Sequence, residues 1–250
     1  MKRKLERFAE IETFDHVFEK GCDLKGNWNS NFFKNDHPLV LELGCGRGEY
    51  TIGLAKAFPE KNFIGIDIKG ARLWRGAKTA KEEDMAHVAF LRVQIESLTQ
   101  YFDKDEVSEI WITFPDPQSA QRRTRKRLTS IRFLKYYREI VKPSGVVHLK
   151  TDDQPLHQFS LEELPLAGGR MQQSSTDIYT DLAGTDSSLI TIQTTYEKIF
   201  LKEGKKINYL SFDFDPGFEF PADLSIFDEP EDEAEDEEYD EQAASEEETA

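Results

Sequence analysis

The stretch "PLVLELGCGRGEYTIGLAKAF", residues 38–58, decides the fold. Its first part, 38–44, is a short apolar run with a β-branched residue, which predicts a buried strand. Glycines follow at positions 44, 46 and 48, and residues 48–58 then carry apolar side chains at helical spacing, ended by Pro59. A strand, a glycine turn and a helix in this order are typical of the first unit of an α/β cofactor-binding fold.

The rest of the chain repeats the alternation of strand and helix. Further strands are predicted at 62–68, 87–94, 108–114 and 145–151, and helices at 69–84, 96–102, 129–141 and 154–164. Strands separated by helices of this length imply a parallel sheet with right-handed crossovers. Residues 169–179 and 206–215 are expected to close the sheet as an antiparallel pair. We therefore predict an α/β, Rossmann-like fold with a mostly parallel, seven-stranded sheet.

Composition divides the chain into three parts. Residues 1–34 are polar and aromatic and are interpreted as an N-terminal arm that covers the site or touches a partner. Residues 35–220 form the main domain. Residues 221–250 are an acidic tail, expected to be disordered because they cannot bury enough apolar surface. Fourteen negative charges of the net −16 lie from Asp228 onward, so the preceding part is close to neutral.

Several classes of protein are excluded by composition. No run of about 18 apolar residues is present, so no membrane span is expected, and the basic N-terminus lacks the apolar region of a secretory signal. Two cysteines, Cys22 and Cys45, are too few for a disulfide framework or a four-ligand zinc site. We expect a cytoplasmic protein without a metal. Both a monomer and a homodimer remain open.

Two carboxylates flank the glycine turn and indicate the kind of ligand. Glu42 comes just before the turn, and Asp67 ends the second predicted strand, 23 residues after Gly44. An acid at about this interval contacts a ribose in such folds. Glu49 stands where a dinucleotide fingerprint needs its third glycine, and Glu42 would repel a pyrophosphate. A cationic adenosine derivative, S-adenosylmethionine, suits both acids. The alternative is a turn that serves only packing.

A second turn, "FPDP" at 114–117, follows the fourth predicted strand. Its two prolines fix the backbone on both sides of Asp116. Ligands of open α/β sheets bind at the carboxyl ends of the strands, where this turn lies. The basic run that follows is expected to bind RNA phosphates; its cations are Arg122, Arg123, Arg125, Lys126 and Arg127. The alternatives are a turn needed only for chain direction and a solvated basic loop.

At this point the sequence resembles a known family, the bacterial tRNA (guanine-N7)-methyltransferases. The resemblance rests on five motifs that occur in the family's order and approximate spacing between about residues 38 and 214: "LELGCGRGEY", "FIGID", "FPDP" with a basic run and "RLTS", "HLKTDD", and "TTYEKIF". The resemblance implies a class I, S-adenosylmethionine-dependent methyltransferase fold.

The resemblance also implies roles for individual residues. Glu42, Asp67 and Gln94 would line the cofactor site above the turn of Gly44, Gly46 and Gly48. Asp116 would be catalytic and border the cofactor. Asp152, Thr194 and Glu197 would contact the substrate, together with the basic run.

This chain departs from the family pattern in two places. Residues 118–121, "QSAQ", replace the usual Trp-Pro-Lys-Lys, so a lysine that would contact the substrate is Ala120 here. Gln94 stands where the family often has an acid.

The implied function is methyl transfer from S-adenosylmethionine to N7 of a guanine in the tRNA variable loop. Three alternatives stay open: the same fold acting on another RNA or on a small molecule, a non-catalytic RNA-binding protein, and, less well supported by the glycine spacing, a nucleotide oxidoreductase.

Overall fold

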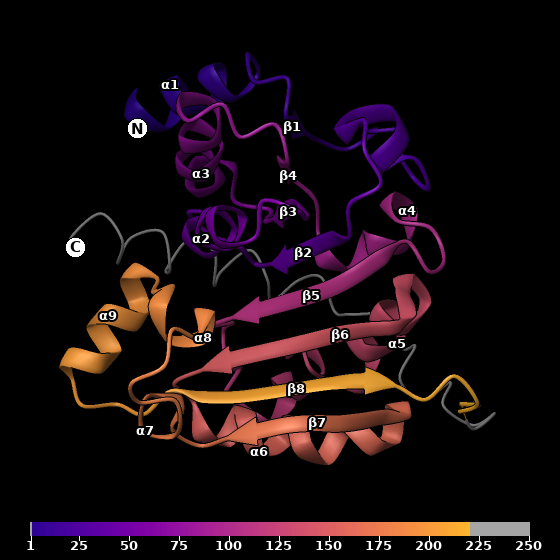
Figure 1. Cartoon of the computed structure of the whole chain (residues 1–250), viewed down its shortest axis with the longest axis vertical. Helices are drawn as coiled ribbons and strands as arrows, with labels where there is room; N and C mark the ends of the chain where they lie inside the picture. The colour runs from indigo at the N-terminus through magenta and orange to yellow at the C-terminus, as the bar shows by residue number, and fades with distance from the viewer. Residues whose placement is uncertain (1, 221–250) are drawn as a thin grey trace. The chain divides into compact units, whose positions relative to one another are not determined.

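The computed structural model describes residues 2–220, and the predicted acidic tail, 221–250, lies outside this range. Within the described range eight strands form one sheet in the order β1-β4-β3-β2-β5-β6-β8-β7 (Figure 1). Their bounds are β1 Val17–Phe18, β2 Leu39–Leu43, β3 Asn62–Ile66, β4 Val88–Leu91, β5 Val107–Thr113, β6 Val141–Thr151, β7 Gly169–Ser175 and β8 Asn208–Phe214.

Helices and single helical turns connect these strands. They are α1 Lys2–Ile11, η1 Trp28–Phe33, α2 Glu49–Ala57, α3 Gly70–Glu82, η2 Ile95–Ser97, α4 Leu98–Tyr101, η3 Gln121–Lys126, α5 Ile131–Ile140, α6 Gln154–Glu163, η4 Leu164–Ala167, α7 Ile178–Asp181, α8 Ser188–Thr191 and α9 Thr195–Lys202.

The strand pairing confirms the predicted α/β class. β1 to β6 run parallel to one another, and β8 pairs antiparallel with both β6 and β7. The chain passes from β2 outward through β3 to β4 and then returns to β5 on the other side of β2. The order therefore reverses between β2 and β5, and the carboxyl ends of these two strands form the switch point where ligands of open sheets bind.

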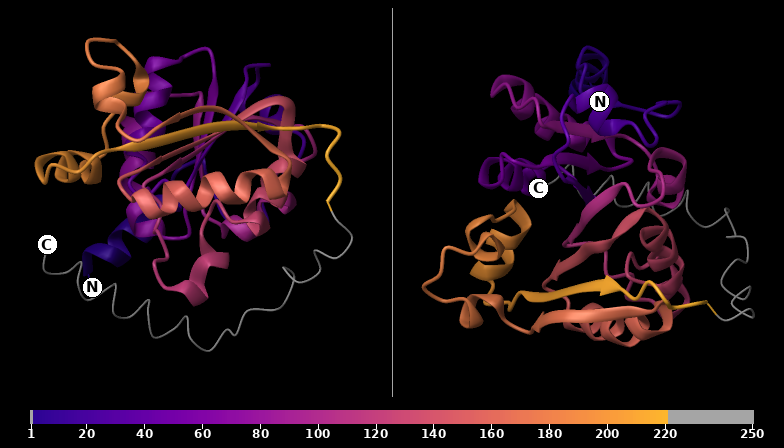
Figure 2. Two further views of the ribbon diagram at one scale, coloured as in Figure 1. Left: turned by 90° about the horizontal axis from the view of Figure 1, so that it is seen from below. Right: turned by 45° about the vertical axis from the view of Figure 1, so that its right-hand side comes forward.

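The two faces of the sheet are covered separately. Side chains alternate along each strand, so Val40, Phe63 and Trp111 join one buried cluster with residues of α2 and α3. The apolar side chains that alternate with these along the strands point to the other face of the sheet and are also buried. The helices α4, α5 and α6, with η4, pack against one another on that face. Figure 2 shows α6 lying along the sheet beside the yellow β8.

The predicted arm, residues 1–34, contributes α1, β1 and η1 to the fold. β1 pairs with β4 and adds an eighth strand to the seven that were expected. Trp28 of η1 is fully buried, donates its indole N–H to the carbonyl of Tyr101 at 3.0 Å, and stacks on Phe102. A role of this segment toward a partner stays a prediction.

One predicted boundary was wrong. The predicted helix, 129–141, and the predicted strand, 145–151, leave residues 142–144 as a turn between them. Instead α5 ends at Ile140 and β6 begins at Val141, which pairs with Val107 before the register shifts by a bulge. A Cβ on Gly145 would lie 2.4 Å from a methyl of Val141, so glycine is needed where the strand bends.

Candidate functional site

The candidate site lies at the carboxyl edge of the sheet, where β2 and β5 end side by side. Leu43 and Ile112 are paired across these strands. The glycine turn therefore begins next to the turn that carries Asp116. In Figure 1 the arrowheads of β2, β5 and β6 point to one side of the molecule, where α8 and α9 also lie.

The three glycines of the turn have different tasks. All three adopt positive φ angles, 68° at Gly44, 53° at Gly46 and 70° at Gly48, which residues with a Cβ rarely adopt. A Cβ on Gly44 or Gly46 would meet no atom within 4 Å, whereas a Cβ on Gly48 would lie 2.8 Å from Phe90. The first two glycines thus leave open space above the backbone, and the third permits close packing.

This difference predicts separable effects of substitution. We expect Gly46→Ala to weaken cofactor binding by at least tenfold, with a stability loss of about 1–2 kcal/mol from the positive φ angle. Gly48→Ala should carry the same backbone strain and add a collision with Phe90, so it should melt at a lower temperature than Gly46→Ala. Calorimetric titration with the cofactor and thermal melting of both variants measure the two effects. Equal melting temperatures for the two variants would contradict the assignment.

Asp67 closes the turn from the neighbouring strand. It follows β3, and its carboxylate accepts hydrogen bonds from the backbone N–H of Gly46 at 2.9 Å and of Lys69 at 2.7 Å. The Cys45 N–H also donates to the carbonyl of Ile66 at 2.9 Å. The turn after β2 and the turn after β3 are therefore tied together, and the half-buried Asp67 carboxylate lies between them.

Glu42 is buried beneath the glycine turn. One of its oxygens accepts from the backbone N–H of Thr51 at 2.7 Å and from the Thr51 hydroxyl, and the other accepts from the Thr113 hydroxyl at 2.7 Å. Burial raises the pKa of Glu42 to about 7, although the hydrogen bonds from Thr51 and Thr113 oppose the shift. In this arrangement Glu42 connects β2, α2 and β5. Its direct contact with the cofactor stays a prediction.

Gln94 lies farther along the same edge. It immediately precedes η2 after β4, its side chain is exposed, and its carbonyl accepts from the Ser97 hydroxyl at 2.7 Å. The structure places Gln94 two strands from the glycine turn in the sheet order.

The turn that holds Asp116 is rigid and partly strained. Phe114 and Gln118, which bracket it, have positive φ angles of 49° and 45°. The Asp116 side chain is exposed and accepts a hydrogen bond from the Gln118 N–H at 2.9 Å. The Phe114 N–H donates to the carbonyl of Lys150 at 2.8 Å. Non-glycine residues in this region cost of order 1–3 kcal/mol each and cluster at functional sites.

Arg127, the last cation of the basic run, contacts the Asp116 turn. Its guanidinium donates to the carbonyls of Pro117 at 3.0 Å and Gln118 at 3.3 Å, and it stacks over Phe159 of α6 at 4.4 Å. Arg127 therefore holds the Asp116 turn from behind.

The other four cations of the basic run belong to η3. Arg122 is exposed, and Arg123, Arg125 and Lys126 are half-buried. Their contact with RNA stays a prediction, as does the one made for Arg127.

Asp152 lies directly after β6 and is half-buried. Its carboxylate forms an ion pair with Lys205, at 2.7 Å between Oδ2 and Nζ. Lys205 also lies 4.2 Å above the ring of Phe200, and Phe200 packs against Phe114 with 5.8 Å between ring centroids. The Asp152 turn and the Asp116 turn are thus connected through α9.

A buried ion pair positions the segment that contains Thr194 and Glu197. The Lys150 ammonium is 2.8 and 2.9 Å from the two oxygens of Glu197, and both side chains are fully buried. Lys150 also donates to the carbonyls of Leu189 at 2.6 Å and Ile192 at 3.2 Å. Burial lowers the pKa of Lys150, and Glu197 opposes this shift.

Thr194 caps α9 by accepting from the Glu197 N–H at 3.1 Å. The Tyr179 hydroxyl donates to Glu197 at 2.7 Å. Both carboxylate oxygens of Glu197 therefore have protein partners, so the structure gives this residue a positioning role. Its contact with substrate stays a prediction.

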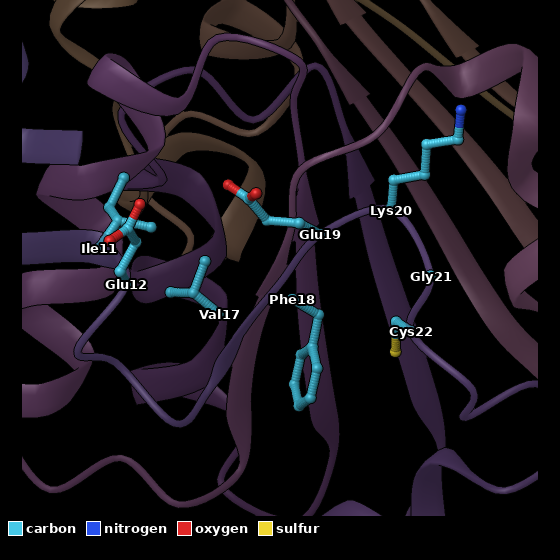
Figure 3. Close-up of a pocket in the computed structure, with 8 residues that line it drawn as sticks. All are labelled: Ile11, Glu12, Val17, Phe18, Glu19, Lys20, Gly21 and Cys22. Atoms are coloured by element: carbon cyan, nitrogen blue, oxygen red, sulfur yellow. The ribbon is translucent and has the colours of Figure 1, made fainter. Parts of the chain in front are cut away.

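A separate depression of about 420 Å³ lies beside β1, the edge strand at the end of the sheet away from β7. Figure 3 shows that its lining comes from the end of α1, from β1 and from the loop that follows, with Phe18 and Cys22 pointing the same way. None of the predicted site residues lines it, so it is not the candidate active site.

Comparison with known proteins agrees with this geometry. A family model described as "Putative methyltransferase" matches residues 36–210. A tRNA (guanine-N(7)-)-methyltransferase of Christiangramia forsetii is 50% identical over 219 residues, which cover 84% of this chain and 97% of that protein. The chain belongs to the tRNA (guanine-N7)-methyltransferase family. The relative from Bacteroides thetaiotaomicron is 42% identical and covers 95% of this chain and 93% of its own length.

Solved structures show the same fold at low identity. A 16S rRNA methyltransferase has a TM-score of 0.60 at 14% identity and covers 80% of this chain and 99% of its own. A 30S ribosomal A1408 methyltransferase has a TM-score of 0.56 at 16% identity, and the match covers 80% of this chain and 98% of that protein. In the part of the chain that the structure describes, no helix meets the length and apolarity that a membrane span requires.

Sequence reasoning missed two residues that organise the site of this family member. Lys150 lies in an apolar strand, and only its partner Glu197, 47 positions away, explains a lysine there. Glu49 was considered only as a break in a fingerprint, yet its carboxylate accepts from the N–H of Thr195 at 2.7 Å and from its hydroxyl at 2.5 Å. For Lys150 the available signal was a lysine within a predicted buried strand, which did not identify its partner. For Glu49 the sequence held no signal.

Proposed function

We propose that this protein transfers a methyl group from S-adenosylmethionine to N7 of a guanine in the tRNA variable loop. The observation that carries the proposal is the adjacency of two turns at the switch point. One turn, at Gly44–Gly46, leaves open space for a cofactor, and the other presents the exposed carboxylate of Asp116. Membership of the tRNA (guanine-N7)-methyltransferase family supports the reaction and the substrate class.

The residues at the first turn fit S-adenosylmethionine. The open backbone at Gly44 and Gly46 would accept the methionine part, and the half-buried Asp67 carboxylate would accept hydrogen bonds from the ribose hydroxyls. Glu42 supplies negative charge below the turn, which favours a cation there. When bound, the cofactor supplies an electrophilic methyl group on a sulfonium.

The second turn suits the acceptor base. N7 of guanine carries a free lone pair, so no proton has to leave before it attacks a methyl group, and no strong general base is required. Asp116 would accept hydrogen bonds from the ring N–H and the exocyclic amine and so orient the purine. Orientation and proximity can supply roughly 7–11 kcal/mol of the acceleration. The purine gains positive charge during attack, and the Asp116 carboxylate favours that charge electrostatically.

The backbone around Asp116 is held so that this orientation is fixed before substrate binds. Arg127 holds Pro117 and Gln118 from one side, and the Phe114 N–H is fixed to Lys150 on the other. Preorganised groups of this kind need no rearrangement during the reaction. The basic η3, which begins five residues after Asp116, would bind the phosphates of the RNA that carries the base.

The reaction is tested by methyl transfer from cofactor labelled in its methyl group. We expect label in unmodified tRNA, and not in ribosomal RNA, protein or a pool of small molecules. Transfer to one of the other acceptors would favour the same fold acting on a different substrate. Cofactor and tRNA binding without transfer to any acceptor would favour a non-catalytic RNA-binding protein.

Cofactor affinity should depend on pH through Glu42. The raised pKa, about 7, means that Glu42 is mostly neutral at a pH of about 6 and mostly anionic at about 8. A cationic ligand favours the anion and so lowers this pKa in the complex, and binding releases a proton. The dissociation constant should therefore fall as pH rises through 7, by up to about tenfold per unit below the free pKa.

Calorimetric titration across this range measures the effect, with Glu42→Gln as the comparison. The variant should bind more weakly and lose the pH dependence. A wild-type affinity that is constant across the range would contradict this role of Glu42.

A further inference from the structure

A row of cations runs along α3. They occur at every third position and comprise Lys69, Arg72, Arg75, Lys78 and Lys81, and no acid lies between the first and the last. Lys69 immediately precedes the helix, two residues after Asp67. The row therefore begins at the rim of the candidate cofactor site and runs away from it.

The far half of this row has structural partners. Lys78 forms an ion pair with Glu10 of α1 at 3.0 Å, and Lys81 lies 4.7 Å above the ring of Phe14. These two cations hold the N-terminal segment against α3. This contact accounts for the presence of Lys78 and Lys81 at their positions.

Two cations of the near half are different, whereas Arg72 between them has a partner. Lys69 and Arg75 are exposed, and within residues 2–220 their side chains form no hydrogen bond or ion pair. The same holds, among these residues, for the exposed Arg47 of the glycine turn. A Cβ on Gly76 would lie 2.9 Å from the carbonyl oxygen of Arg47, so Arg47 passes against α3 beside Arg75. Three cations without internal partners thus border the open glycine turn.

The sheet order places these cations opposite η3. β3 and β5 lie on either side of β2, α3 follows β3, and η3 follows Asp116 after β5. Adjacent strands are about 4.8 Å apart, so the ends of β3 and β5 are separated by roughly 10 Å across the glycine turn. The segment that follows β3, with Lys69, and the segment that follows β5, with Asp116 and η3, therefore leave the sheet on either side of the glycine turn.

We propose that Arg47, Lys69 and Arg75 form a second phosphate-binding surface, which holds the RNA backbone on the side of the target nucleotide opposite η3. The inference rests on the proposed function and names the substrate contacts of the same site. Phosphate contacts fix register and orientation without reading sequence. A backbone held at one side only can pivot about that contact. Phosphate contacts on both sides of the target nucleotide fix its position while its base leaves the stack to reach Asp116.

The test compares two variants with the same change in charge. Lys69→Gln with Arg75→Gln removes two cations at the carboxyl edge. Lys34→Gln with Lys104→Gln removes two exposed cations before β2 and β5, at the opposite edge, which also lack a side-chain partner within the described residues. The dissociation constant for unmodified tRNA is measured against salt concentration for both variants and for the wild type, together with cofactor affinity and melting temperature.

We expect the first variant to bind tRNA on the order of tenfold more weakly at low salt. The slope of log affinity against log salt should become shallower by about 1.4–1.8, since each phosphate contact contributes about 0.7–0.9. Cofactor affinity, melting temperature and the matched variant should be unchanged. A salt slope equal to that of the wild type, or an equal loss in the matched variant, would overturn the proposal. A change in melting temperature or self-association alone would assign these cations to protein contacts and also overturn it.

If the proposed function itself were wrong, the wild type would show no salt-dependent binding of tRNA. If only the second phosphate-binding surface were wrong, the wild type would bind tRNA and the variant would bind it equally well. Arg47→Gln is measured separately because Arg47 lies within the turn assigned to the cofactor, and we expect its salt slope for tRNA binding to become shallower by about 0.7–0.9. A salt slope equal to that of the wild type would remove Arg47 from the proposed surface.

Discussion

Asp116→Asn is expected to lower kcat for methylation of tRNA by about 10²–10³, the usual effect of removing one preorganised electrostatic contact to a transition state. The asparagine oxygen can still accept from the Gln118 N–H at the position where Asp116 accepts at 2.9 Å, so the turn should keep its shape. What is lost is the negative charge and one acceptor for the base. Single-turnover rates, with cofactor affinity measured by calorimetry, separate this loss from a loss of binding.

The control for this substitution is Asp36→Asn, which changes an exposed aspartate before β2, at the other end of the strands. It should leave the rate unchanged. If Asp116→Asn turns over tRNA at a rate near that of the wild type while binding cofactor normally, the orienting role of Asp116 is wrong.

Lys150→Met should produce the largest loss of stability, about 3–5 kcal/mol, because it leaves the Glu197 carboxylate buried without its ionic partner. For a chain of this size each kcal/mol lowers the melting temperature by about 2–4 °C. The double variant Lys150→Met with Glu197→Leu should recover much of the loss, since it removes both buried charges. Thermal melting of the two single variants and of the double variant gives the coupling energy.

Arg170→Met is the matched control, because Arg170 pairs with Asp213 at 2.7 Å but is 55% exposed. Its loss should be at most about 1 kcal/mol. The double variant at Lys150 should fold but methylate slowly, since the carbonyls of Leu189 and Ile192 lose the ammonium that fixes them. Additive effects of the two single substitutions would contradict the coupling inferred here.

The turns of the site were predictable from sequence because their causes are local. The glycine turn is recognisable because its three glycines all have positive φ. The Asp116 turn is recognisable because prolines stand on both sides of the aspartate. The strand and helix pattern then places both turns at the same edge, because parallel strands with helical crossovers align their carboxyl ends.

The groups that fix these turns were not predictable, because their causes are distant in the chain. Arg127 resembled its basic neighbours in sequence, and only the folded position of Pro117 shows that it supports the turn. Lys150 required knowledge of Glu197, and Glu42 required Thr51 and Thr113, which reach it from α2 and β5. The edge strand β1 has two residues, too few for a periodic pattern to reveal.

Mapping of 7-methylguanosine in tRNA tests the central claim most directly. Unmodified tRNA is incubated with the protein and S-adenosylmethionine, and the RNA is then cleaved chemically at 7-methylguanosine. The structure and family predict a single cofactor-dependent cleavage in the variable loop, which is lost or greatly reduced with Asp116→Asn. An active, cofactor-binding protein that leaves tRNA uncleaved, or that places the methyl group on another atom or another RNA, would contradict the account.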